Sequence, residues 1–177
     1  MRLFGLSLTL VVVLLAAPSV APAQSDQHIT LPATKATLKG PSVRMNQTTK
    51  VAAWWKGSDD RATWRFKVSK PRKMDLLLVY GVPNDLAQQP FVVELDGKAI
   101  VQGKLPGTGG YAKFQRQAIG TIKLAAGEHR LTFRPARAVR GDDLIDLQSV
   151  ILAPHDPKRA KTAAAPKPAD VANVGAA

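Results

Sequence analysis

Residues 91–105 have the sequence FVVELDGKAIVQGKL, and this stretch decides the fold. Two strand-like runs, 91–95 and 98–105, flank the dipeptide Asp96-Gly97. A type I′ turn needs positive φ at both central positions, and Asp-Gly is one of the pairs that meets this requirement. The stretch therefore predicts a β-hairpin with a two-residue turn.

The next segment outward, residues 63–68, shows strict alternation of apolar and polar side chains. Its sequence is TWRFKV, so Trp64, Phe66 and Val68 share one face of a strand, and Arg65 and Lys67 share the other. We expect the apolar face to pack in a core.

Further strand patterns follow at regular intervals. Residues 76–80 are apolar on both faces, as in a central strand, and 129–134 alternate again, with Leu131 and Phe133 facing inward. Gly120 interrupts a strand pattern and suggests a bulge. No window shows sustained helical periodicity. The chain is predicted to be all-β, a sandwich of antiparallel strands.

The two ends of the chain differ from this pattern. Residues 1–23 combine Arg2, an apolar run and a small-x-small site at 21–23, which predicts a signal peptide, although a retained anchor is an alternative. Residues 24–153 form the predicted domain, and the Ala-, Pro- and Lys-rich residues 154–177 form a predicted disordered tail. We expect a secreted or periplasmic protein with no integral membrane segment after signal removal. It has no cysteine, so its core must hold without disulfides.

The charge is strongly basic, with 25 Lys and Arg residues against 13 Asp and Glu residues and a formal net charge of +12. An exported protein of this charge should attract polyanions such as anionic polysaccharides, whereas export argues against nucleic acid as a partner. Arg65, Lys67, Arg130 and Arg134 are expected on the solvent faces of two strands. They are either a solvated surface or a strip that binds sulfate or carboxylate groups.

The sequence offers little catalytic chemistry. Its three histidines show no metal-binding spacing, and no nucleophile motif is present. The carboxylate pairs Asp59-Asp60 and Asp142-Asp143 stand beside glycines, where turn formation is the simpler account. For His129 a role in a turn is also expected. We predict that the protein is not an enzyme.

Six segments, taken in order, resemble a known family. They are LPATKATLKGPSVRM (31–45), WWKGSDDRATWRFKV (54–68), KPRKMDLLLVYG (70–81), FVVELDGKAIVQGKL (91–105), TGGYAKFQRQAIGTIKLAAGEHRLTFRP (108–135) and DLIDLQSVILAP (143–154). This order resembles the carbohydrate-binding modules of family six, most closely those at the C-termini of secreted fucosidases and sulfatases. The resemblance implies a jelly-roll sandwich with a sugar site in the loops at one edge, and calcium in many members.

The resemblance also implies ligand-binding residues. The family's Thr-Gly-Gly-Trp segment, whose aromatic ring stacks on sugar, corresponds to residues 108–111 and makes Tyr111 the first candidate, in a polar loop. A second aromatic corresponds to Trp54 or Trp55. Adjacent residues of an extended chain point to opposite faces, so one of the two is expected in the core and the other exposed.

The metal site of the family matches poorly. Pro32 and Thr34 occupy positions where the family has Glu ligands, and Asp146 alone matches. Calcium takes six to eight oxygens, so no metal and no other cofactor is predicted. The predicted function is a non-catalytic carbohydrate-binding module that prefers anionic or sulfated polysaccharide. The alternative is a structural or adaptor sandwich that binds another exported protein.

Overall fold

The computed structural model describes residues 28–141 and 143–157. The predicted signal peptide, Asp142 and the part of the predicted tail beyond residue 157 lie outside the described residues. Within this part of the chain, no helix has the length and apolar character needed to cross a membrane.

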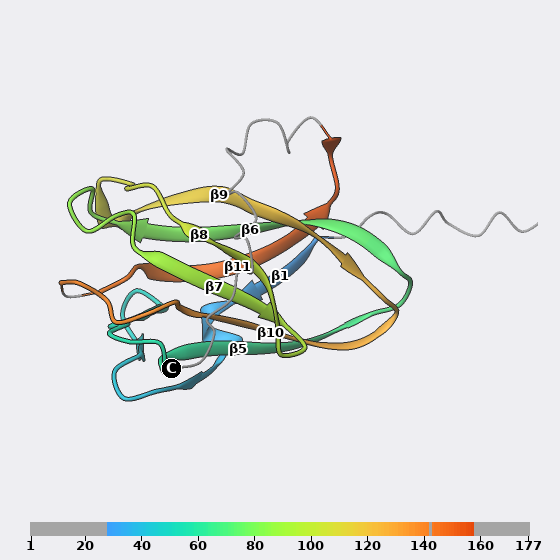
Figure 1. The fold of residues 1–177 in the computed structure, drawn as a ribbon, viewed down its shortest axis with the longest axis horizontal. Helices are drawn as coiled ribbons and strands as arrows, with labels where there is room; N and C mark the ends of the chain where they lie inside the picture. Colours follow the sequence, from blue (N-terminus) through green and yellow to red (C-terminus); the bar gives the residue numbers. More distant parts are fainter. Residues whose placement is uncertain (1–27, 142, 158–177) are drawn as a thin grey trace, which may run out of the picture.

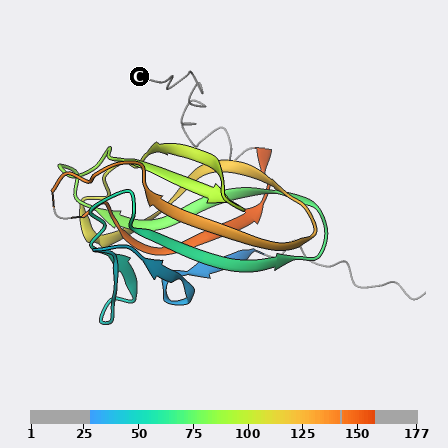
Figure 2. The same cartoon turned by 60° about the horizontal axis from the view of Figure 1, so that its bottom comes forward.

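The fold consists of two antiparallel sheets stacked face to face (Figures 1 and 2). The six-stranded sheet has the order β3-β4-β11-β6-β9, and β1 also pairs with β11. The five-stranded sheet has the order β2-β5-β10-β7-β8. A 3₁₀ turn, η1 (Ala33–Lys35), follows β1. The strands are β1 (Ile29–Pro32), β2 (Thr37–Lys39), β3 (Arg44–Asn46), β4 (Val51–Ala53), β5 (Arg61–Val68), β6 (Arg72–Val82), β7 (Pro90–Leu95), β8 (Lys98–Lys104), β9 (Gly110–Leu124), β10 (Gly127–Pro135) and β11 (Asp146–Pro154).

The predicted β-hairpin and the predicted alternation of inward-facing and outward-facing side chains are both confirmed. β7 and β8 pair through a two-residue turn in which Asp96 and Gly97 have φ of 52° and 83°. In β5 the side chains of Trp64, Phe66 and Val68 are buried, and in β10 those of Leu131 and Phe133 are buried as well. These inward faces meet the buried face of the other sheet in one hydrophobic core.

The predicted bulge is also present. Leu76 of β6 pairs with Gly120 of β9, and Leu77 pairs with Ala118, so Ile119 is the extra residue. β9 continues through the bulge as one strand.

Loops gather at one end of the sandwich, at the left of Figures 1 and 2. The buried side chain of Asp60 ties two of them together. Its Oδ1 accepts the N–H groups of Ser42 and Val43 at 2.9 and 3.0 Å, and its Oδ2 accepts those of Lys56 and Gly57 at 2.7 and 3.2 Å. Burial raises the pKa of Asp60, but these four donors outweigh it and leave the pKa below its ordinary value.

We predict that Asp60→Ala destabilises the protein by about 3 kcal/mol or more, because four backbone donors lose their acceptor. The matched control is Asp59→Ala, since the Asp59 side chain is 85% exposed and lies 4.0 Å from Arg61. That change should cost less than about 0.5 kcal/mol. Urea unfolding of both variants measures the difference, and equal losses would show that the Asp60 contacts contribute little.

Candidate functional site

Trp54 is the exposed aromatic ring of the loop end. It follows β4 directly, has a φ of 63° and is 45% exposed, and it is the one large hydrophobic residue that is exposed in the described part of the chain. A bulky residue with positive φ is strained, and such strain persists where surrounding contacts impose it. The contact here is Asp143, whose Oδ2 accepts the Trp54 N–H at 2.5 Å.

Trp55 has the opposite environment. It is fully buried, its indole N–H donates to the carbonyl of Ala52 at 3.0 Å, and its ring meets the Phe133 ring edge-on. Its backbone N–H donates to Asp143 Oδ1 at 2.7 Å. The prediction that one of the two tryptophans is core and the other exposed is therefore confirmed. The reason differs from the one predicted, because Trp54 has a left-handed backbone conformation and the segment is not an extended strand at this point.

Tyr111 lies beside the same aspartate. Its hydroxyl donates to the backbone carbonyl of Asp143 at 3.4 Å, and its side chain is half-buried against the core. The predicted loop position is wrong, because Tyr111 is the second residue of β9. β9 comes very close to β6 here: a Cβ added at Gly81 would lie 2.1 Å from the Tyr111 carbonyl oxygen.

Asp143 therefore joins both aromatic residues, and its own side chain is buried. Burial raises its pKa to about 7, against the lowering effect of the N–H groups of Trp54, Trp55 and Leu144. Asp146, at the start of β11, raises it further, and burial raises the pKa of Asp146 itself to about 6.

Two more buried polar side chains position the surrounding loops. The side-chain amide of Gln89 donates to the carbonyl of Arg140 at 2.9 Å, and its oxygen accepts the Arg140 N–H at 2.5 Å. The hydroxyl of Thr108 accepts the Val82 N–H at 2.9 Å. These contacts tie the loops after β6, β8 and β10 to one another.

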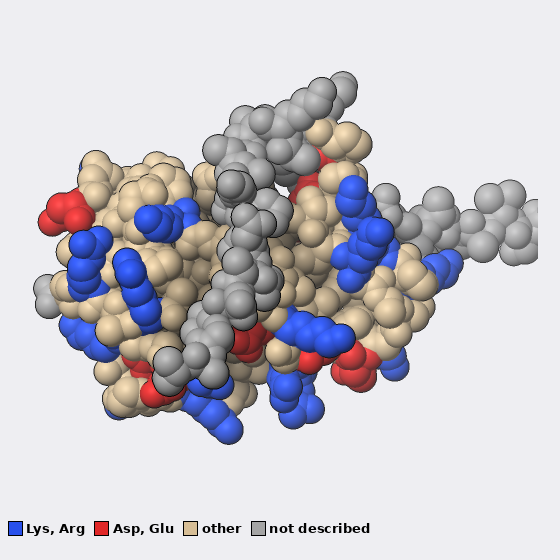
Figure 3. Space-filling model, viewed as in Figure 1, with Lys and Arg blue, Asp and Glu red and all other residues tan. Residues whose placement is uncertain are grey.

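The four predicted basic residues lie on the outer face of the five-stranded sheet, away from Trp54. Arg65 and Lys67 are exposed on β5, and Arg130 is exposed on β10. Arg134 is half-buried and donates from Nε to Glu94 Oε1 at 2.7 Å. Lys67 pairs in register with Glu128, and Arg65 pairs with Arg130. Figure 3 shows Lys and Arg side chains spread over one face of the molecule, with fewer acidic ones between them.

Two histidines have structural partners. Nδ1 of His129 lies 2.8 Å from Asp96 Oδ2, and Nε2 lies 3.0 Å from the carbonyl oxygen of Ala125. His155 Nδ1 lies 2.6 Å from Asp75 Oδ1, and the Asp156 N–H donates to Asp75 Oδ2 at 3.1 Å. The predicted start of the tail at residue 154 is thus too early, because a buried carboxylate holds these residues.

The calcium implied by the family resemblance does not fit the described residues. Among them, no three His, Asp or Glu side chains gather as a possible ligand set. The carbonyl of Pro32 already accepts the indole N–H of Trp64 at 2.8 Å. The donors fall short of the several carboxylates that calcium usually takes.

The residues that organise the site were not predicted from the sequence. Asp60 and Asp143 were expected only in turns, and neither their contacts with distant loops nor the role of Gln89 was predicted. A buried carboxylate leaves only a weak local signal, an acidic residue beside a short apolar run, as in Asp143-Leu144-Ile145. Its partners are up to 89 positions away in the chain.

No protein-family model matches the chain, and no curated protein matches it. Solved structures do. A family 35 carbohydrate-binding module (CBM35) from Cellvibrio japonicus Abf62 is similar at 16% identity and a TM-score of 0.57, over 73% of this chain and 95% of that one. The CBM36-1 domain of a xylanase from the hindgut metagenome of Trinervitermes trinervoides is similar at 12% identity and a TM-score of 0.58, over 73% and 99%.

The GH26-CBM35 β-(1,4)-mannanase of Podospora anserina is similar at 20% identity and a TM-score of 0.58, over 75% of this chain but only 28% of the mannanase. At these identities the likeness shows the fold. The chain is an all-β, antiparallel jelly-roll sandwich of the kind found in carbohydrate-binding modules, as the sequence predicts. The named neighbours belong to families 35 and 36, so the finer resemblance to family six stays a prediction.

We predict that the protein loses stability as the pH rises from 5 to 8. Between pH 5 and about 7, Asp143 keeps its proton in the folded state but has lost it in the unfolded state, so a rise in pH over this interval favours unfolding, and above the folded pKa the effect levels off. The free energy of unfolding should fall by on the order of 2 kcal/mol.

Urea unfolding at pH 5 and pH 8 measures this fall, with Asp143→Asn as the comparison. The variant should be less stable overall, because asparagine offers one acceptor oxygen for two N–H groups. Its stability should nevertheless fall less between the two pH values, and the fall that remains is expected from Asp146 and His129, whose pKa values are also raised. An equally steep fall in the variant would assign the pH dependence to other groups.

Proposed function

We propose that this chain is a non-catalytic glycan-binding module of an exported protein, and that Trp54 and Tyr111 contact the sugar. The observation that carries the proposal is Trp54, an exposed indole held in a strained backbone conformation by a buried aspartate. Exposed aromatic rings offer a flat apolar surface on which the C–H face of a sugar can stack. The jelly-roll fold, shared with carbohydrate-binding modules, supports the same function.

The position of Tyr111 supports a shared site. The Tyr111 hydroxyl and the backbone N–H of Trp54 both bond to Asp143, so one residue positions the backbone of Trp54 and the side chain of Tyr111. Loops tied together by Asp60, Gln89 and Thr108 surround them. The site therefore needs little reorganisation when ligand binds, which favours affinity.

The carboxylates of the loop end support a binding role without catalysis. Asp60 accepts four backbone N–H groups, and Asp143 accepts those of both tryptophans. A glycosidase needs two carboxyl groups on opposite sides of the scissile bond. Here both buried carboxylates are used to hold the loops.

The proposal extends to a preference for anionic or sulfated polysaccharide. The net charge of +12 would raise the local concentration of such chains around the protein. The field would act on any polyanion and would weaken with salt. Export, and with it a secreted or periplasmic location, stays part of the proposal.

We expect residues 24–177 to bind at least one glycan on an array, and Trp54→Ala to weaken that binding at least about tenfold. Tyr111→Phe keeps the ring and should bind within about threefold of the unaltered protein, whereas Tyr111→Ala should lose most binding. Lys70→Ala, an exposed residue in the β5–β6 turn at the opposite end of the sandwich, is the control.

Folded protein that binds no neutral or anionic glycan would overturn the proposal. So would glycan binding that Trp54→Ala leaves unchanged. Sugar-independent capture of a second exported protein would instead favour the adaptor alternative.

A further inference from the structure

Two arginines face each other across neighbouring strands of the five-stranded sheet. Arg65 of β5 is the register partner of Arg130 of β10, and both side chains are exposed on the outer face. Directly opposite residues have Cβ atoms about 5 Å apart, and like charges in such pairs destabilise a sheet. Placing two arginines opposite each other therefore lowers the stability of the sheet, and the needs of folding do not explain why both are present.

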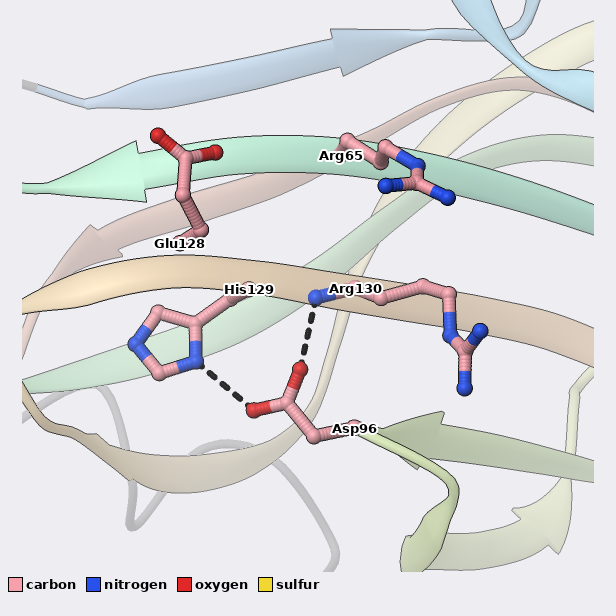
Figure 4. Close-up of a pocket in the computed structure, with 5 residues that line it drawn as sticks. All are labelled: Arg65, Asp96, Glu128, His129 and Arg130. Atoms are coloured by element: carbon pink, nitrogen blue, oxygen red, sulfur yellow. Dashed lines mark hydrogen bonds and ion pairs between the residues drawn. The ribbon is translucent and has the colours of Figure 1, made fainter.

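Three arginines of the chain have side-chain partners that these two lack. Arg134 binds Glu94, Arg61 lies 4.0 Å from Asp59, and Arg44 donates to backbone carbonyls, including that of Pro41 at 2.8 Å. Neither guanidinium of the Arg65–Arg130 pair has a hydrogen bond or ion pair to any described residue. Both side chains line a shallow, open depression of about 260 Å³, in which Arg65 lies over β5 and the Arg130 guanidinium turns towards the β7–β8 turn (Figure 4).

The nearest carboxylate, that of Asp96, already has hydrogen-bond partners on both oxygens. Its Oδ1 accepts the backbone N–H of Arg130 at 2.7 Å, and its Oδ2 binds the His129 ring. The other ring nitrogen of His129 faces the carbonyl of Ala125, which can only accept. Both ring nitrogens therefore donate, and His129 is an imidazolium that matches the charge of Asp96.

The pKa shifts agree with this assignment. The hydrogen bonds to Ala125 and Asp96 raise the pKa of His129, and the His129 hydrogen bond lowers that of Asp96. The remaining carboxylate at the depression, Glu128, pairs in register with Lys67. Arg130 also lowers the pKa of Asp96 through its charge, but it shares this carboxylate with His129, and no ion pair holds the guanidinium of Arg65 or of Arg130 among the described residues.

We propose that Arg65 and Arg130 bind oxyanions of an acidic polysaccharide, either sulfate esters or uronate carboxylates. A guanidinium presents a planar fork of N–H donors that fits both groups, and two forks that line one depression can bind neighbouring anionic groups of one polysaccharide chain. This inference rests on the proposed function only in taking the ligand to be a glycan. The site is separate from Trp54 and adds a contact on the sheet face.

The test is affinity for chondroitin sulfate, hyaluronan and dextran at moderate salt. Chondroitin sulfate carries sulfate and carboxylate, hyaluronan carries carboxylate alone, and dextran is neutral. The variant is Arg65→Gln with Arg130→Gln, and the matched control is Arg116→Gln with Lys123→Gln, which removes two exposed charges from β9. Binding of at least one acidic chain should weaken at least about tenfold in the variant and less than about twofold in the control.

Two further measurements separate this inference from folding effects and from the loop site. Thermal unfolding of Arg65→Gln with Arg130→Gln at low salt should show no loss of stability, because the change relieves a like-charge pair. Trp54→Ala should leave part of the acidic-chain binding in place, and that remainder should be lost when the arginine changes are added. A chain that binds chondroitin sulfate but not hyaluronan would identify sulfate as the anion.

Equal weakening in the variant and the control would overturn the inference, since net charge alone would then account for binding. Failure to bind either acidic chain would overturn it as well. If glycan binding at Trp54 persists in that case, the proposed function stands without this second site.

Discussion

The hydrogen bonds that Asp143 accepts from the N–H groups of Trp54 and Trp55 determine what this molecule presents at its loop end. They join residues 89 and 88 positions apart in the chain. With these two hydrogen bonds in place, the Trp55 side chain points into the core, where it packs on Phe133. Trp54 is left in a left-handed backbone conformation with its ring in solvent. A buried carboxylate with two backbone donors can impose such strain because leaving those donors unpaired would cost more.

The rest of the loop end is built on the same principle. With no cysteine in the chain, the long connections are held by side chains that bind backbone groups. Asp60 joins the segments before β3 and before β5, and Gln89 joins those before β7 and before β11. This organisation explains how a small sandwich can keep a rigid surface at one end while the core lies between the sheets.

The fold was largely predictable from local patterns. Alternation in β5, the Asp96-Gly97 turn and the bulge beside Gly120 each depend on neighbouring residues, and all three occur in the structure. The site was only partly predictable. Trp54 and Tyr111 could be named as candidates, but the residue that joins them, Asp143, could not, because its contacts depend on how distant segments meet.

The basic residues on the outer face of the five-stranded sheet were also only partly predictable from the sequence. The sequence grouped four residues as one strip, whereas the structure divides them by their partners. Arg134 is held by Glu94, Lys67 lies opposite Glu128, and Arg65 and Arg130 lie opposite each other. Strand register decides this division, and composition carries no information about register.

The central claim is that Trp54, and not a core tryptophan, meets the sugar. The chain has three tryptophans, and two of their indole N–H groups are bonded inside the protein, Trp55 to Ala52 and Trp64 to Pro32. The most direct measurement is the nuclear magnetic resonance spectrum of the three indole N–H groups during titration with a glycan that binds. The account predicts that the Trp54 signal moves while the other two stay in place. Binding that leaves the Trp54 signal unmoved would contradict it.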